Sequence, residues 1–340
     1  MRATAALLSL ALIAFAAGEI AWPRVTHAVT PTTAPVPDAT TTTTVPVATT
    51  MVAATRPYAV DQSNIVLTDP ARPPSPRSTE RSSARSMRVL VLHPEGATGP
   101  LPLVVFAHGL DSEPEVYLPL LQSWAEAGYL VAAPELPGSA RDLNGPPEPD
   151  DVAEAARDVS FVVAAMLAGD AGPVDGTRVA VAGHSDGGSS VAALALNTAY
   201  RDPRVDAYLV LSGVIAPSIT EGSWDGGAGA PLLVVVGTDD EYGDFAGSTV
   251  VYQRADDPKT FVSVPGGDHL GIYVGTGSVA DGVRATTTAF LDASLTGPRW
   301  RSAYGDDRTT STETSTAGTL PRFSSQCMVF RSSGQPTPGP

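Results

Sequence analysis

Short, continuous runs of apolar residues alternate with longer amphipathic segments between residues 58 and 297. The runs include LVVFA at 103–107, RVAVA at 178–182 and LLVVV at 232–236. Strands that are apolar along their whole length are typical of a sheet buried on both faces, as parallel sheets are. The alternation therefore predicts an α/β domain over 58–297, with a mostly parallel central sheet of about eight strands and helices on both faces.

The same patterns give approximate bounds for the elements. Strands are predicted at 63–68, 87–92, 103–107, 129–133, 178–182, 207–211, 232–236 and 260–264, and helices at 115–127, 152–167, 188–197, 247–254 and 278–295. Ligands of such sheets bind outside the carboxyl ends of the strands. We therefore expect the functional residues in the loops that directly follow the strands.

The segments on either side of this domain differ from it in composition. Residues 1–17 contain one arginine before an apolar run whose length suits a signal peptide better than a membrane span. Residues 18–57 are rich in threonine and proline and predict an extended linker. Residues 298–340 lack hydrophobic periodicity and predict a disordered tail. We expect a secreted or cell-surface protein, with residues 1–17 either cleaved or kept as an anchor.

Composition limits the partners and the chemistry. The chain has 36 acidic and 21 basic residues and a formal net charge of −15. Nucleic acids and anionic membranes attract clustered positive charge, so we expect neither as a partner. Cys327 is the single cysteine, which excludes an internal disulfide and argues against a thiolate metal site. We expect no metal, no cofactor and a monomeric chain.

The sequence RVAVAGHSDGG places a serine where a predicted strand meets a predicted helix. Ser185 has Gly183 two positions before it and Gly187 two positions after it. A serine exposed at such a sharp turn adopts strained backbone angles, and side chains at the two flanking positions would clash. The pattern is typical of a nucleophilic serine whose hydroxyl stands free above the sheet.

A serine hydroxyl needs a base to accept its proton, and the base needs an acid to orient it. His269 follows the last predicted strand in the sequence PGGDH and is the candidate base, whereas the side chain of His184 must point away at so sharp a turn. Asp239 and Asp240 follow the strand at 232–236. We favour Asp240 as the acid and keep Asp239 as the alternative.

Negative charge that develops on a substrate carbonyl oxygen needs two N–H donors. One is expected from Asp186, the residue directly after the serine. The other is expected from Leu110, in the loop after the strand at 103–107, where Gly109 allows close approach of the backbone.

With these motifs in order, the chain resembles the α/β-hydrolase superfamily. More narrowly, it is similar to the bacterial branch of chlorophyllase-like esterases, platelet-activating-factor acetylhydrolase-like enzymes and cutinase-type polyester hydrolases. The resemblance covers residues 88–270 through PLVVFAHGL, LQSWAEAGYLVAAPELPG, DVSFVVAAML, RVAVAGHSDGG, VDAYLVLSG, PLLVVVGTDD and PGGDH. It implies cleavage of carboxylic esters through an acyl-serine intermediate, with Ser185 as nucleophile, Asp240 as acid and His269 as base.

Three functional interpretations remain open. The first is a secreted serine esterase that acts on small-molecule or lipid-like esters. The second is an acyltransferase or peptidase with the same triad, and the third is a non-catalytic surface module on the hydrolase scaffold. No large insertion precedes the loop that carries Asp239 and Asp240. Such an insertion could shield an acyl intermediate from water, so its absence favours hydrolysis. Polyester hydrolases usually have methionine where this chain has Asp186, which argues against a polyester substrate.

Overall fold

The computed structural model describes residues 57–78, 83–141, 143–149, 151–227, 229–242, 244–296 and 328–331. The expected signal segment at 1–17 lies outside the described residues, as does the expected linker at 18–57 apart from Pro57.

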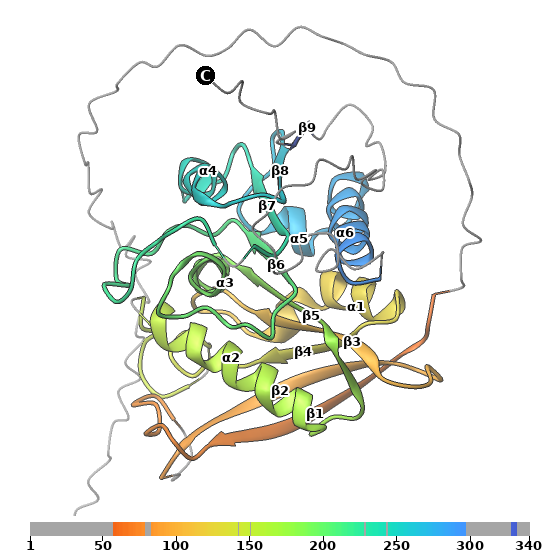
Figure 1. Ribbon diagram of the computed structural model, residues 1–340, viewed down its shortest axis with the longest axis vertical. Helices are drawn as coiled ribbons and strands as arrows, with labels where there is room; N and C mark the ends of the chain where they lie inside the picture. Colours follow the sequence, from red (N-terminus) through yellow and green to blue (C-terminus); the bar gives the residue numbers. More distant parts are fainter. Residues whose placement is uncertain are drawn as a thin grey trace, which may run out of the picture. The chain divides into compact units, whose positions relative to one another are not determined.

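One sheet runs through the described part of the chain, with the strand order β1-β2-β4-β3-β5-β6-β7-β8-β9 (Figure 1). Its strands are β1 (Val60–Asp69), β2 (Arg85–Pro94), β3 (Leu101–Ala107), β4 (Leu130–Pro134), β5 (Val174–His184), β6 (Ala207–Leu211), β7 (Leu232–Gly237), β8 (Lys259–Val264) and β9 (Met328–Arg331). Strands β4, β3, β5, β6, β7 and β8 pair in parallel, and β1, β2 and β9 add antiparallel pairs at the two edges. The predicted mostly parallel α/β sheet is confirmed.

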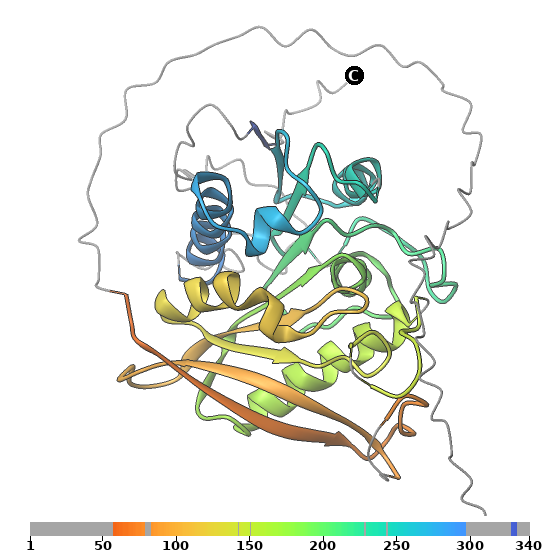
Figure 2. The same ribbon diagram turned by 180° about the vertical axis from the view of Figure 1, so that it is seen from behind.

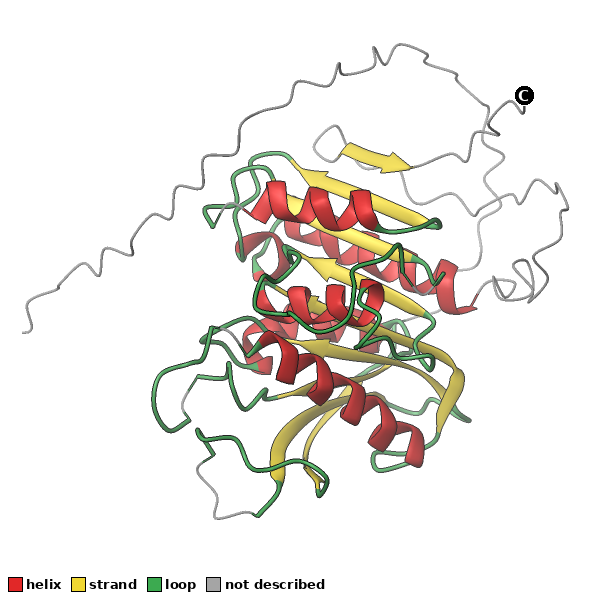
Figure 3. Ribbon diagram, turned by 60° about the vertical axis from the view of Figure 1, so that its left-hand side comes forward, coloured by secondary structure: helices red, strands yellow, loops and turns green. Residues whose placement is uncertain are grey.

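Helices cover both faces of this sheet. They are α1 (Leu118–Glu126), α2 (Val152–Ala168), α3 (Asp186–Leu196), α4 (Asp244–Arg254), α5 (Gly271–Val274) and α6 (Ser278–Leu291). Helices α2, α3 and α4 share one buried apolar cluster with the sheet, and α1, α5 and α6 share the other. Figures 1 and 2 show the two sides of the sheet in turn, and Figure 3 shows the helices packed against its strands.

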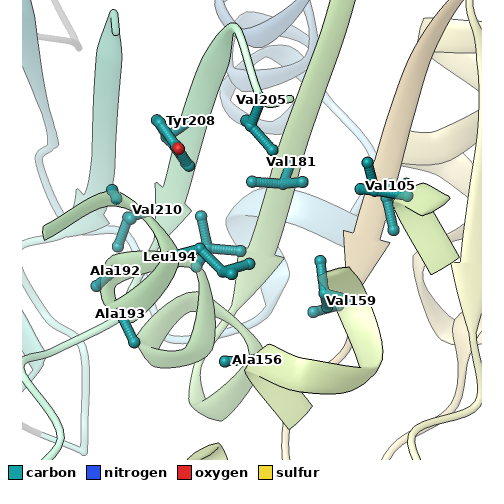
Figure 4. Packing of buried hydrophobic residues seen from close by; sticks show 14 of the residues in the cluster. Val105, Ala156, Val159, Val181, Ala192, Ala193, Leu194, Val205, Tyr208 and Val210 are labelled. Carbon is teal, nitrogen blue, oxygen red and sulfur yellow. The ribbon is translucent and has the colours of Figure 1, made fainter. Parts of the chain in front are cut away.

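Alternation of side chains along the central strands explains why these strands are apolar throughout. Val105, Val181 and Val210 lie on neighbouring strands and pack toward Val159 of α2 and Leu194 of α3 (Figure 4). The residues next to these valines point to the opposite face and join the cluster that contains the α1 residues. Because successive strand residues face opposite sides, a sheet covered on both faces needs apolar residues at every position.

Some element bounds differ from the prediction for identifiable reasons. The predicted helix at 115–127 is a 3-10 helix at Pro114–Tyr117 followed by α1, whose second residue is Pro119. Proline lacks an N–H group and fits only the first turn of a helix. Strands β1 and β2 are longer than predicted because they pair along their whole length, from Val60 opposite Pro94 to Asp69 opposite Arg85.

Strand β9 corrects the expectation that residues 298–340 lack regular structure. Residues 328–331 pair with β8 in an antiparallel register. The rest of that segment, 298–327 and 332–340, lies outside the described residues. Among the described helices, none is both long enough and apolar enough to cross a bilayer.

Candidate active site

Ser185 lies at the sharp turn between β5 and α3. Its backbone angles are φ 57° and ψ −122°, a left-handed conformation that costs free energy in a residue with a side chain. The turn is held by hydrogen bonds from the Ser185 N–H to the Leu211 carbonyl and from the Ser189 N–H to the Ser185 carbonyl. The strained serine expected from the sequence is therefore present.

Glycines on both sides of this turn are required by close backbone contacts. A Cβ atom at Gly183 would overlap the carbonyl oxygen of Gly187, and one at Gly187 would overlap the carbonyl oxygen of Ala107. Strand β3, strand β5 and helix α3 therefore meet at van der Waals distance only because these positions lack side chains.

His269 and Asp240 come together from the loops after β8 and β7. The His269 Nδ1 atom lies 2.9 Å from Asp240 Oδ2, and the Asp240 side chain has no exposed surface. Asp240 Oδ1 also accepts the backbone N–H of Tyr242. The carboxylate is thus fixed as an acceptor, so His269 donates its Nδ1 proton and keeps Nε2 as the basic nitrogen.

Asp239 is directed elsewhere. It is exposed, its Oδ1 accepts the Thr238 hydroxyl at 3.0 Å, and its N–H donates to the Gly267 carbonyl. Of the two aspartates left open by the sequence, the structure brings Asp240 to the histidine.

Asp244, at the start of α4, is a residue of this site that the sequence reasoning missed. Its Oδ2 lies 3.5 Å from His269 Nδ1, and its side chain is 19% exposed. Burial and the charge of Asp240 raise the pKa of Asp244 to about 7, while His269 opposes the rise. The predicted helix began at residue 247, which left Asp244 in a loop. The only available signal was a third aspartate four residues after Asp240.

His184 is completely enclosed and points away from Ser185, as expected. Its Nε2–H donates to the His269 carbonyl at 2.8 Å, and its Nδ1 accepts the Tyr117 hydroxyl at 2.8 Å. Tyr117 in turn accepts the Gly109 N–H. Burial lowers the pKa of His184 to about 3, so the ring stays neutral. This chain of hydrogen bonds connects the loop after β3 to the loop that holds His269.

His108 sets the orientation of the Gly109–Leu110 peptide. The Leu136 N–H donates to His108 Nε2 at 2.9 Å, so the ring proton is on Nδ1, which donates to the Gly109 carbonyl at 2.8 Å. Burial lowers the pKa of His108 to about 4, which keeps this neutral form. In a trans peptide the N–H points opposite to the carbonyl, so the Leu110 N–H is directed away from His108.

Asp186 is the first residue of α3. The N–H groups of the first helical turn have no carbonyl partner within the helix, and the helix dipole places partial positive charge there. Asp186 therefore lies directly after Ser185, at the end of α3 that carries partial positive charge.

A sequence model of the chlorophyllase family matches residues 49–220, half of the chain. The chain belongs to the chlorophyllase family. It is a carboxylic ester hydrolase.

Solved structures support the fold of this chlorophyllase-family chain. The fold matches 1167 chains of solved structures, and one of them is a ferulic acid esterase from Streptomyces cinnamoneus. That structure aligns with a TM-score of 0.58 at 20% identity, over 72% of this chain and 92% of its own. Such a likeness shows the α/β-hydrolase fold. No curated protein sequence matches the chain.

Among the described residues of this chlorophyllase-family protein, Asp240, Asp244 and His269 form the one group whose spacing would also suit a cation. Their donor atoms all lie within 4.8 Å of one another. The hydrogen bond between His269 Nδ1 and Asp240 already accounts for the closest of these contacts. We interpret the group as a histidine with two carboxylate neighbours.

Proposed function

We propose that this protein is a secreted serine hydrolase that cleaves uncharged carboxylic esters through an acyl-serine intermediate. Ser185 is the nucleophile, His269 the base and Asp240 the acid, with the N–H groups of Leu110 and Asp186 as oxyanion donors. The main support is the 2.9 Å contact of His269 Nδ1 with the buried Asp240 carboxylate. Both residues follow the carboxyl ends of strands in the sheet, as the strained Ser185 does.

The reaction follows from these roles. The Ser185 Oγ attacks the ester carbonyl carbon while its proton moves to His269 Nε2, and the oxyanion of the tetrahedral intermediate accepts the two N–H groups. The intermediate expels the alcohol, which takes the proton from Nε2. Water then attacks the acyl-serine, gives its proton to Nε2, and the carboxylic acid leaves as Ser185 recovers its proton.

The charges around the site favour uncharged esters. Asp240 and Asp244 contact His269, and the charge of Asp186 contributes to the raised pKa of Asp244. An anionic substrate would be repelled by these carboxylates. Apolar side chains also flank the base. The Tyr242 ring centre lies 4.6 Å from that of His269 and Tyr242 is 73% exposed, while Leu270 is 36% exposed.

The test of this function uses the full chain and Ser185→Ala. Hydrolysis of p-nitrophenyl acetate, butyrate and octanoate is measured, and methyl ferulate is added because the structural neighbour is a ferulic acid esterase. We expect hydrolysis by the wild type and a loss on the order of 10⁴ to 10⁶ in turnover for the variant. A Ser185→Ala protein as active as the wild type would refute the mechanism. Labelling of Ser185 by a fluorophosphonate without any hydrolysis would favour the acyltransferase or peptidase alternative.

Export is part of the proposal and is tested separately. Residues 1–17 have the composition of a signal peptide. We expect the protein in the medium or at the cell surface of a host that expresses the full chain. Mass spectrometry of its N-terminus distinguishes a cleaved segment from a retained anchor, and retention of the protein in the cytoplasm would contradict export.

A further inference from the structure

The proposed triad leaves one carboxylate without a role. His269 Nδ1 faces Asp240 Oδ2 at 2.9 Å and Asp244 Oδ2 at 3.5 Å. A histidine has a single Nδ1 proton, so it donates a full hydrogen bond to one carboxylate at a time. Asp240 holds that bond in the structure, and Asp244 lies just beyond hydrogen-bonding distance.

The two carboxylates come from differently fixed positions. Asp240 lies in the loop after β7, has a completely buried side chain and accepts the Tyr242 N–H with its second oxygen. Asp244 opens α4, retains 19% exposure of its side chain, and has its oxygen directed at the same nitrogen. A small shift of the imidazole toward α4 would bring Nδ1 within hydrogen-bonding distance of Asp244.

We propose that Asp244 is a reserve acid of the triad, a positioning residue that accepts the Nδ1 proton of His269 when Asp240 cannot. The inference rests on the proposed function, because it needs His269 as the base. In the undisturbed enzyme Asp244 contributes little, since Asp240 makes the shorter bond. Without Asp240, Asp244 preserves the tautomer that leaves Nε2 free to accept the serine proton.

The charges that face Asp244 support this role. Burial and the charges of Asp240 and Asp186 together raise the pKa of Asp244 to about 7, against the lowering effect of His269. Glu241 accepts the backbone N–H of His269 at 3.1 Å. Of the repulsions from Asp240 and Asp186, that from Asp240 is the larger. Loss of the Asp240 charge therefore lets Asp244 ionise more readily, which is when His269 needs a second acceptor.

The test is a double-mutant cycle on the full chain, with kcat and KM measured for p-nitrophenyl butyrate. Loss of an isolated triad acid costs on the order of 10⁴ in turnover. We expect Asp240→Ala to cost only about 10- to 100-fold and Asp244→Asn less than about threefold. The double variant should lose about 10⁴-fold, far more than the product of the single losses, with the change in kcat rather than in KM.

Asp239→Asn is the matched control, because it removes a carboxylate from the same loop that faces Thr238 instead of the histidine. We expect its rate to stay within about twofold of the wild type. Asp240→Asn replaces Asp240→Ala if the alanine variant does not fold. The proposal is overturned if an Asp240 variant alone loses about 10⁴-fold, or if Asp244→Asn has the same effect in both backgrounds. It is also overturned if a chelator abolishes wild-type activity, since the three side chains would then hold an ion.

Failure of the reserve role can be told apart from failure of the proposed function. If Ser185→Ala or His269→Ala retains wild-type activity, the proposed triad is wrong, and the reserve role of Asp244 is refuted together with it. If both variants are inactive while the cycle is multiplicative, the triad stands and Asp244 is not a reserve acid.

Discussion

Two groups of buried carboxylates in this protein have opposite surroundings. In the arginine-paired cluster (Asp158, Arg72 and Arg85), the Asp158 side chain has no exposed surface and receives three guanidinium hydrogen bonds of 2.6 Å, two from Arg85 and one from Arg72. In the histidine-paired cluster (Asp240, Asp244 and His269), two carboxylates share one imidazole.

The difference shows which buried charges provide stability and which provide chemistry. Burial disfavours the charge of Arg85, but the hydrogen bonds and charge of Asp158 outweigh this and raise its pKa. Burial raises the pKa of Asp158, while the hydrogen bonds and charges of Arg85 and Arg72 lower it. In the histidine-paired cluster, burial and the like charge of Asp240 instead raise the pKa of Asp244 to about 7. Unsatisfied carboxylate charge beside a histidine is typical of a catalytic site.

Replacing the histidine should have the largest effect of any change in either cluster. His269→Ala removes the proposed base, so we expect turnover of p-nitrophenyl butyrate to fall on the order of 10⁴ to 10⁶. The melting temperature should fall less than in Asp158→Ala, because the buried Asp240 carboxylate loses the histidine but keeps the hydrogen bond from the Tyr242 N–H. Rate and thermal melting are measured on the same preparation. A variant that unfolds instead would show that the histidine-paired cluster also serves stability.

Asp158→Ala should give the reverse result. It removes the carboxylate that the guanidinium groups of Arg85 and Arg72 share, and breaking a buried ion pair costs about 3–5 kcal/mol. Arg72 keeps Asp69 and Glu154 as partners, and Arg85 keeps Asp151 at 3.6 Å. We expect the free energy of unfolding in urea to fall by that amount, with kcat per folded molecule preserved.

The control for Asp158→Ala is Asp281→Ala, which breaks a pair with Arg284 whose aspartate side chain is 66% exposed. Exposed pairs contribute about 0–1 kcal/mol. Equal losses of stability in the two variants would contradict the role assigned to the arginine-paired cluster.

Asp244→Asn should change how stability depends on pH. The pKa of Asp244 is raised in the folded protein from 3.8 to about 7, so the folded state binds this proton more tightly than the unfolded state does. Its contribution to stability is complete below about pH 4 and is lost as the pH rises through about 7. A shift of this size corresponds to about 4 kcal/mol, so the variant should gain roughly 10 °C in melting temperature over the wild type at pH 8, relative to the difference at pH 4. A difference that is the same at both pH values would place Asp244 in a more polar environment.

The sequence predicts the histidine-paired cluster much better than the arginine-paired cluster. Ser185 and two residues of the histidine-paired cluster, Asp240 and His269, lie in loops that follow strands. Because the carboxyl ends of parallel strands lie on the same side of a sheet, local sequence patterns are enough to predict that these residues come together. Gly183 marks the sharp turn through a local contact with Gly187, whereas the contact that requires Gly187 comes from Ala107 of β3.

Contacts between distant segments could not be predicted in the same way. Asp158 meets Arg85 across 73 residues, and the proton position on His108 depends on Leu136. Strand β9 pairs with a strand more than 60 residues earlier. Asp244 needed the exact start of α4, and helix ends are the least predictable part of an element.

Asp186→Asn should produce the smallest effect. The Asp186 charge is the weakest of the causes that raise the pKa of Asp244, and the substitution keeps the backbone N–H proposed as an oxyanion donor. Removing the charge lowers the pKa of Asp244, so the pH at which Asp244 loses its proton should fall by less than about one unit. Melting temperatures are measured from about pH 4 to 9 for two pairs of proteins. One pair is Asp186→Asn and Asp186→Asn/Asp244→Asn, and the other is the wild type and Asp244→Asn. The pH at which the two members of a pair diverge is compared between the pairs. An upward displacement would mean that Asp186 pairs with a cation rather than repelling Asp244. No displacement would mean that the histidine-paired cluster is governed by burial and Asp240 alone.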